Sequence, residues 1–343
     1  MRSTKYRCRM RHARQPAKGQ RGIAIVTALL VVALVATLAA SVMWRELVAV
    51  RDVSNQRLNT EMMWVERAGV EWARAALREQ ASSSNVAFYG QQWSSPLHDV
   101  QLADLLPRDA IAVNGDLADA YISGQVEDAE AKFNVMDLVS RSGPGQPYQI
   151  NANGMLAYRR LLGELSLNPA LAQPTADYVL RSLGHTGGDS WPLQLVSVQD
   201  LSRIPGYDTD TIRTLSDFVT VLPGYTYINV NTAAAPVLIA AIPTLSDGQA
   251  QMLIQRRGTA YFNSTADVAL ALAPILAAGT TPATTTPGFL PSGAIASVNS
   301  DYYIVHCRIH SARINTRIDT LIGRYGTGDY SWTSVIWVHR LAS

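Results

Sequence analysis

The sequence predicts an α+β protein whose long N-terminal helix crosses a membrane. An uncharged run of 22 residues, Ile23 to Trp44, leads into a helical pattern that continues to about Gln80. Strand-like alternation occurs near residue 121 and again after residue 300, and short helical patterns fill the interval between them. This order of elements indicates an antiparallel sheet with a large all-α domain inserted between its strands.

The uncharged run is as long as the roughly 20 apolar residues that a helix needs to cross a bilayer core. Cationic flanks stay cytoplasmic, so we expect the rest of the chain to be exported. Without residues 1–22 the chain has 21 basic and 27 acidic residues, a formal charge of −6, which argues against nucleic-acid binding. The eight basic residues before the run, with no acidic residue among them, are Arg2, Lys5, Arg7, Arg9, Arg11, Arg14, Lys18 and Arg21.

Two kinds of export signal fit this segment. An ordinary secretory signal is cut after its apolar core, here near Ala39-Ala40-Ser41, although the run is long for such a core. The second kind is cut ahead of the apolar run, between Gly22 and Ile23, and leaves the helix on the mature protein. Arg21-Gly22 followed by an uncharged helix is similar to this second signal, which is that of type IV prepilins.

The helical pattern continues past Trp44 without a proline. A helix from about Ile23 to about Gln80 is on the order of 85 Å long at about 1.5 Å per residue. We expect its first third to lie in lipid and the remainder to pack on a domain through one apolar stripe. The residues of this stripe, spaced mostly three to five apart, are Leu47, Val50, Leu58, Met62, Val65, Val70, Trp72, Ala76 and Leu77.

The Ser/Gly/Pro-rich residues 141–147 mark a candidate domain boundary. Beyond it the pattern predicts helices over 155–165 and 174–183 and a third that opens with Ser197 as its N-cap. The predicted organisation is a leader (1–22), a transmembrane part of the helix (23–44), an α+β domain (45–140 and 295–343) and an inserted helical domain (141–294).

Four segments alternate like strands: an edge-like one from Tyr121 to Val126, then 301–314, 315–322 and 331–340. In the second of these, Cys307 lies on the apolar face, which predicts a buried, unreactive thiol. His306 and His310 share the opposite face. Because they are roughly 13 Å apart along a strand, they cannot share one metal ion, and we expect both to be exposed.

The acidic residues Glu127, Asp128 and Glu130 follow the first strand and are expected in a solvated turn. The sequence contains no nucleophile elbow, phosphate loop or Cys-x-x-Cys pair. A membrane-anchored hydrolase therefore has no support, and we expect no catalytic residues.

A helix–turn–helix pattern occurs twice, from Ser197 to Phe218 and from Asn231 to Val268, with Asn231 and Thr232 as candidate capping residues of the second copy. The pattern resembles DNA-binding helical hairpins, which offer an alternative function, a membrane-tethered DNA-binding protein. The second turn lacks the glycine of such hairpins, so packing is favoured over DNA binding. The cations that would have to support DNA binding are Arg203, Arg213, Arg256 and Arg257.

Five stretches together resemble the minor pseudopilin K family of type II secretion systems over nearly the whole chain. They are RGIAIVTALLVVAL, VEDAEAKFNVMDL, LVSVQDLSRIPGYD, VTVLPGYTYINVNTAAAPVL and the C-terminal strand pair. The resemblance implies a pseudopilin α+β domain with a large helical insertion, anchored by a single span in the inner membrane with its C-terminal domain in the periplasm. It also implies a structural role in protein secretion, at the tip of a pseudopilus that exports folded proteins across the outer membrane.

The resemblance further implies cleavage by the prepilin peptidase after Gly22 and N-methylation of Ile23. The implied partners are minor pseudopilins I and J, the major pseudopilin and an exported substrate protein, with no nucleic acid.

One position gives this resemblance a physical test. Most pilins carry Glu at the fifth mature residue, where its carboxylate pairs with the N-terminal ammonium of a neighbouring subunit; here that residue is Thr27. A tip subunit has no neighbour above it, so a carboxylate would be buried in lipid without a partner, at a cost of roughly several kcal/mol. A threonine can instead bond back to its own helix.

The family is also associated with calcium, held by an acidic loop. In this chain the corresponding stretch is short and retains only Asp177 and Asp189. Calcium takes about six to eight oxygen ligands. We therefore do not carry the calcium site over to this sequence, and a metal site is not assigned.

Overall fold

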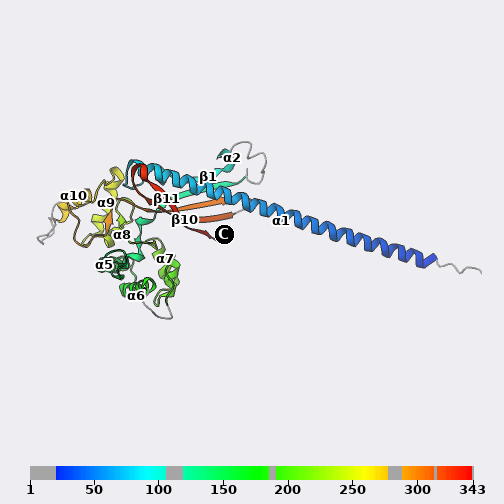
Figure 1. Cartoon of the computed structure of the whole chain (residues 1–343), viewed down its shortest axis with the longest axis horizontal. Coiled ribbons are helices and arrows are strands. Elements are labelled where there is room, and N and C mark those ends of the chain that lie inside the picture. The colour runs from blue at the N-terminus through cyan, green and yellow to red at the C-terminus, as the bar shows by residue number, and fades with distance from the viewer. Residues whose placement is uncertain (1–20, 106–118, 185–190, 277–287, 313–314, 342–343) are drawn as a thin grey trace, which may run out of the picture. The chain divides into compact units, whose positions relative to one another are not determined.

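The computed structural model describes residues 21–105, 119–184, 191–276, 288–312 and 315–341. It divides into two units, residues 1–61 and 62–343, which are described separately. Helix α1, Arg21–Ser83, forms the described part of the first unit and continues without interruption into the second (Figure 1). The predicted long helix is therefore confirmed; it begins two residues earlier and ends three residues later than expected.

The second unit is built on a five-stranded antiparallel sheet with the strand order β1-β2-β9-β10-β11. The chain between β2 and β9 forms a large, mainly helical insertion between neighbouring strands, as predicted, although it also contains six two-residue strands. The strands are β1 Leu97–Gln101, β2 Tyr121–Asp128, β9 Tyr302–His310, β10 Asn315–Tyr325 and β11 Trp332–Leu341.

Strand β2 is not the edge strand that was predicted, because β1 pairs with its outer side. Strand β1 had no counterpart among the predicted elements. It has only five residues, its register shifts between Leu97 and Val100, and Asp99 has a φ of 43°. A shift of register breaks the period-two alternation on which strand prediction depends.

The last turns of α1 lie on one face of this sheet. Ala73, Ala76 and Leu77 are buried there with Val126 of β2 and Val305 of β9 in one apolar cluster. Burial of a leucine-sized side chain stabilises a fold by roughly 1.5–3 kcal/mol, so this cluster anchors the helix to the sheet.

The predicted apolar stripe is wrong for Leu47, Val50 and Trp72, which are 45, 67 and 52% exposed. Its buried members are Leu58, Met62, Ala76 and Leu77. Near the end of the helix, the side chain of Gln80 extends toward the segment that follows α1. Its Nε2 donates to the carbonyl oxygens of Ser84 and Val86, both at 2.9 Å. These bonds occupy carbonyl groups just beyond the helix end, so the chain leaves α1 in a fixed direction.

The inserted part has one continuous apolar core, in which Phe133, Tyr158 and Leu201 are fully buried. Predicted helices occur at α5 and α6, and Ser197 opens a 3₁₀ helix, Val198–Arg203, rather than an α-helix. After α1, the α-helices of the described chain are α2 Leu102–Leu105, α5 Ala152–Glu164, α6 Ala172–Leu183, α7 Thr209–Ser216, α8 Ala235–Ala241, α9 Asp247–Thr259 and α10 Thr265–Leu276.

Three two-stranded ladders lie in the insertion, and two of them connect segments that are distant in the sequence. β3 pairs with β6 and β7 pairs with β8, both in parallel, while β4 pairs with β5 antiparallel. These strands are two residues long: β3 Phe133–Asn134, β4 Val139–Ser140, β5 Gln149–Ile150, β6 Val219–Thr220, β7 Ile228–Asn229 and β8 Ala296–Ser297.

Candidate functional site

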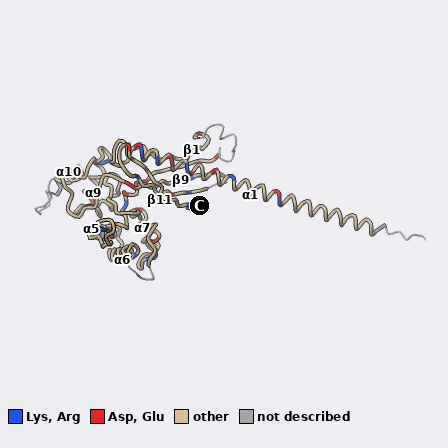
Figure 2. Tube along the Cα trace, in the orientation of Figure 1, with Lys and Arg blue, Asp and Glu red and all other residues tan. Residues whose placement is uncertain are grey.

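The apolar part of α1 is the first candidate site. Every residue from Ile23 to Trp44 is exposed, and Figure 2 shows no charged residue along this stretch of the tube. The helix is long and apolar enough to cross a membrane, with none of its most apolar window buried. A run of large apolar side chains without protein contacts is suited to lipid or to other apolar helices.

Thr27 lies within this stretch. Its hydroxyl donates to the carbonyl oxygens of Ile23, at 3.1 Å, and Ala24, at 3.0 Å. The expected bond back to its own helix is therefore confirmed. Gly22 and Ile23 lie in the first turn of α1. Cleavage between them and methylation of Ile23 stay predictions, and the leader residues 1–20 lie outside the described chain.

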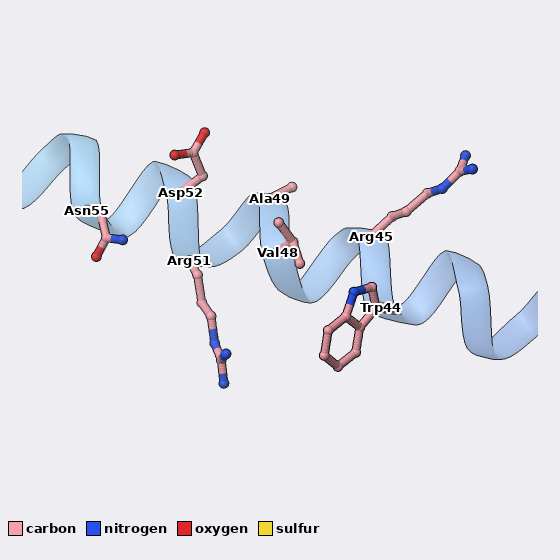
Figure 3. A pocket seen from close by; sticks show the side chains of 7 residues that line it. All are labelled: Trp44, Arg45, Val48, Ala49, Arg51, Asp52 and Asn55. Carbon is pink, nitrogen blue, oxygen red and sulfur yellow. The ribbon is translucent and has the colours of Figure 1, made fainter.

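A second surface lies on α1 immediately after the uncharged run (Figure 3). Trp44 and Arg51 project to one side of the helix, and Arg45 and Asp52 project to the other. All of them come from one helix, so the shallow hollow between them cannot enclose a small ligand. A mixed aromatic and cationic surface at the end of an apolar span matches the composition of a membrane–water interface.

Glu127 and Asp128 end β2 and Glu130 follows it, and the expected solvated turn is wrong for Asp128 and Glu130. The side chain of Glu127 is 25% exposed. Asp128 is fully buried and Glu130 is 5% exposed. Asp128 Oδ2 accepts hydrogen bonds from the hydroxyls of Thr232, at 2.6 Å, and Ser300, at 2.7 Å, and from Nδ2 of Asn229, at 2.9 Å. A buried carboxylate is tolerable because these donors replace its water.

A signal for this burial was present in the sequence. In β2, Ile122, Gly124 and Val126 lie on the same face of the sheet, and Ile122 and Val126 are buried there. Asp128 follows Val126 at the same spacing of two residues. Strict alternation therefore places its carboxylate on the buried face. The partners of that carboxylate come from residues 229–300, which the local pattern could not reveal.

Two further carboxyl groups are buried, those of Glu130 and Asp137. Glu130 Oε1 accepts from the backbone N–H of Asp301 at 2.8 Å, and Asp137 Oδ1 accepts from the backbone N–H of Thr226 at 2.8 Å. Burial, and then the neighbouring Asp128 carboxylate, raise the pKa of Glu130 well above its usual range. Burial likewise raises the pKa of Asp137, against the hydrogen bonds from Thr226 that lower it.

Asn231 and Thr232 are not helix caps, which corrects the prediction; the residue before α8 is Ala234. Thr232 donates to Asp128, as described above. Asn231 instead holds Phe262, with Nδ2 donating to the carbonyl oxygen and Oδ1 accepting from the N–H, both at 2.9 Å. Both residues are buried, and their side chains bond to distant segments of the chain instead of capping a helix.

His306 is not a freely exposed strand histidine. Its ring nitrogens lie 2.7 Å from Asp319 Oδ1 and 3.0 Å from Glu127 Oε2, and Lys132 Nζ lies 2.8 Å from the other oxygen of Glu127. Burial lowers the pKa of His306, but the hydrogen bonds to Asp319 and Glu127 outweigh it and raise the pKa to about 9. The cluster is therefore an ion-pair network across three strands.

Cys307 is buried, as predicted, and burial raises the pKa of its thiol to about 11. Its Sγ would lie 3.8 Å from a Cβ at Gly69, so this glycine brings α1 close to β9. Among the described residues, no three His, Cys, Asp or Glu side chains are placed to hold a metal ion. Asp177 accepts from Gln173 on its own helix, and Asp189 lies outside the described chain.

Three of the four arginines that a DNA-binding function would need make contacts within the chain. Arg203 pairs with Asp200 and Arg213 with Asp210, at 2.7 and 2.9 Å. Arg257 donates to the backbone carbonyls of Val230, at 2.6 Å, and Ala233, at 2.7 Å. Such contacts support a packing role for these arginines, and the absence of DNA binding stays a prediction.

A protein with this arrangement is a pseudopilin-type α+β protein: a long helix, apolar in its first third, packs on an antiparallel sheet that carries an inserted helical domain. The family described as "Type II secretion system (T2SS), protein K" matches residues 228–287, and a second description of the same protein, for its first part, matches residues 131–224. These matches confirm the resemblance to the type II secretion system protein K family that was found in the sequence.

Two relatives illustrate the match. The type II secretion system protein K of Pseudomonas aeruginosa is 28% identical over 275 residues, which cover 73% of this chain and 76% of that protein. A chain in the crystal structure of the GspK-GspI-GspJ complex from the type 2 secretion system of enterotoxigenic Escherichia coli superposes with a TM-score of 0.59. The likeness covers 85% of this chain and 99% of that chain at 18% identity, and it shows a shared fold.

Proposed function

We propose that this chain caps the tip of a type II secretion pseudopilus, where it binds minor pseudopilins I and J. It is held by α1 in the inner membrane, its folded part lies in the periplasm, and its role is structural rather than catalytic. The match to the protein K family supports a role in type II secretion. The proposed partners are the other two proteins in the name of the related crystallised complex.

The single observation that carries the tip position is the environment of Thr27. Its hydroxyl is satisfied by the carbonyls of Ile23 and Ala24, and no residue from Ile23 to Trp44 is acidic. A helix of this kind can lie in lipid without a subunit above it to neutralise a carboxylate. A subunit within the shaft has such a neighbour, whereas the last subunit has none.

The exposed apolar residues beyond the membrane segment support lateral packing below the tip. Val48, Val50 and Val53 are 50, 67 and 64% exposed on α1. A helix that shows large apolar side chains outside the lipid needs other helices to cover them. The helices of neighbouring pseudopilins are suited to this.

The test compares Thr27→Glu with Thr27→Ser in cells that carry the whole secretion system. We expect Thr27→Glu to insert into the membrane but to lower secretion and the recovery of subunits I and J with the chain. Thr27→Ser keeps the back-bonding hydroxyl and adds no charge, so it should behave as the unmodified protein. Normal secretion and complex recovery for Thr27→Glu would contradict the tip position.

A further inference from the structure

Strand β11 forms one edge of the five-stranded sheet. The other edge, β1, is short, contains a register shift and has Asp99 at a positive φ, which are features that prevent pairing with another chain. Strand β11 has ten residues, and among the described elements only β10 pairs with it. The pairing of β11 with β10 has one register shift, between Leu321 and Ile322 of β10. The two edges are therefore protected to different degrees.

Strand β11 is apolar on both of its faces. Val335 and Val338 lie opposite Ile322 and Thr320, on the face where α1 packs, and are 38% and 53% exposed. Trp332 and Leu341 are 55% and 41% exposed. Large apolar side chains next to unpaired backbone groups favour the addition of a strand.

Charged residues do not guard this edge. Trp332–Leu341 contains no lysine, proline or glycine, and its arginine, Arg340, is held by Glu66 of α1 at 2.7 Å. At the other end, the carbonyl oxygen of Thr333 accepts from Arg74 of α1 at 2.8 Å. The backbone from Ser334 to Leu341 is the part of this edge that remains available for pairing.

The ligand of such an edge must offer alternating N–H and C=O groups at strand spacing, which is the chemistry of an extended polypeptide. We infer that β11 pairs with a strand of a different pseudopilin subunit, which adds a sixth strand to the sheet. This inference rests on the proposed function, since it names the surface by which the chain binds its neighbour.

A second copy of this chain does not fit as the antiparallel partner. Arg74 contacts Thr333 while Glu66 contacts Arg340, so β11 runs opposite to the direction of α1. Antiparallel pairing of two β11 strands would direct the two α1 helices oppositely. Subunits of one membrane-anchored assembly share one direction, so opposed helices do not suit two copies of this chain in the same assembly.

Hydrogen exchange followed by mass spectrometry tests the inference. The full-length chain in detergent is compared alone and in complex with full-length subunits I and J. We expect backbone amides of β11 to exchange about tenfold more slowly, or slower still, in the complex, and those of β1 to be unchanged. The double variant Val335→Lys, Val338→Lys should lower recovery of the complex, while Leu193→Lys, at a 72% exposed apolar position of the helical part, should not.

The outcomes separate the two proposals. A complex in which β11 exchanges as fast as in the free chain overturns the edge pairing and leaves the tip function in place. Failure of the unmodified chain to form any complex with I and J overturns the proposed function and this inference together. Protection of β11 in the chain alone, with a mass of two copies, shows self-pairing and also overturns the inference. An unchanged unfolding midpoint in the double variant ensures that a lost complex is not due to misfolding.

Discussion

The carboxylate of Asp128 accepts a 2.6 Å hydrogen bond from the hydroxyl of Thr232, which lies 104 residues further along the chain. The same oxygen accepts from Ser300 and Asn229, at 2.7 and 2.9 Å. Strand β2 leaves the sheet at Asp128, and the chain returns to β9 just after Ser300. One buried side chain therefore ties the exit and the return of the inserted domain to each other.

We predict that Asp128→Ala destabilises the fold strongly. The substitution removes the carboxylate that accepts from the hydroxyls of Thr232 and Ser300, and each buried donor left without an acceptor costs about 1–3 kcal/mol. The expected total is roughly 3 kcal/mol or more, measured by chemical denaturation of the full-length protein in detergent. Asp210→Ala is the control, because Asp210 is 84% exposed in its side chain and should change stability by less than about 0.5 kcal/mol.

The His306 cluster predicts a loss of stability at alkaline pH. The pKa of His306 is raised to about 9 from 6.5, so protonation favours the folded state. This contribution is fully present below pH 6.5 and is lost as the pH rises through 9. The unfolding temperature at pH 6 and pH 9.5 should differ less in His306→Gln than in the unmodified protein. An equal difference in both would show that Glu127 and Asp319 do not stabilise the imidazolium.

The acid side of the same cluster gives an opposite dependence. Burial raises the pKa of Glu127, but the hydrogen bond from His306 and the charge of Lys132 lower it to about 2. Its contribution is present above pH 4.5 and is lost as the pH falls toward 2. Glu127→Gln should therefore lessen the fall in stability between pH 4.5 and pH 3, and a profile identical to that of the unmodified protein would contradict this.

Two helical glycines predict effects of opposite sign. A Cβ at Gly69 would make an ordinary contact, 3.8 Å, with Sγ of Cys307, and alanine favours a helix over glycine by about 1 kcal/mol. Gly69→Ala should therefore stabilise the protein slightly. A Cβ at Gly154 would overlap the carbonyl oxygen of Asp137, so Gly154→Ala should lower the free energy of unfolding. Equal effects from the two substitutions would refute this assignment of packing.

Processing at the membrane yields a prediction for Gly22. If the prepilin peptidase cuts after this residue, Gly22→Ala should leave a precursor that is larger by the 22-residue leader. Gel mobility of the protein is compared in cells with and without the peptidase. Identical mobility of the unmodified chain in both would contradict cleavage ahead of the apolar segment.

The local sequence pattern was sufficient to predict the structure where the spacing of apolar residues matches their burial. The apolar run and its helical extension predicted α1, and alternation predicted both faces of β9, including buried Cys307. The large insertion between strands was also predicted from the order of elements. These features depend on the spacing of residue types along the chain, which can be read from one sequence.

Long-range partners explain most of the errors. Asp128, Thr232 and His306 carry residue types that are typical of turns, caps and exposed strands, yet the fold places each beside distant polar groups. Their burial depends on contacts separated by tens of residues, and no local period records such contacts. Strand β1 was missed for a different reason, since its irregular register removes the alternation.

The central claim is that α1 keeps its apolar segment in the mature protein and that the chain assembles through it. The most direct test is mass spectrometry of the N-terminal peptide of protein purified from the membrane of a secreting cell. We expect the mature chain to begin at Ile23, carrying a methyl group on its amine. A mature chain that begins near Ser41, without the apolar segment, would contradict the account.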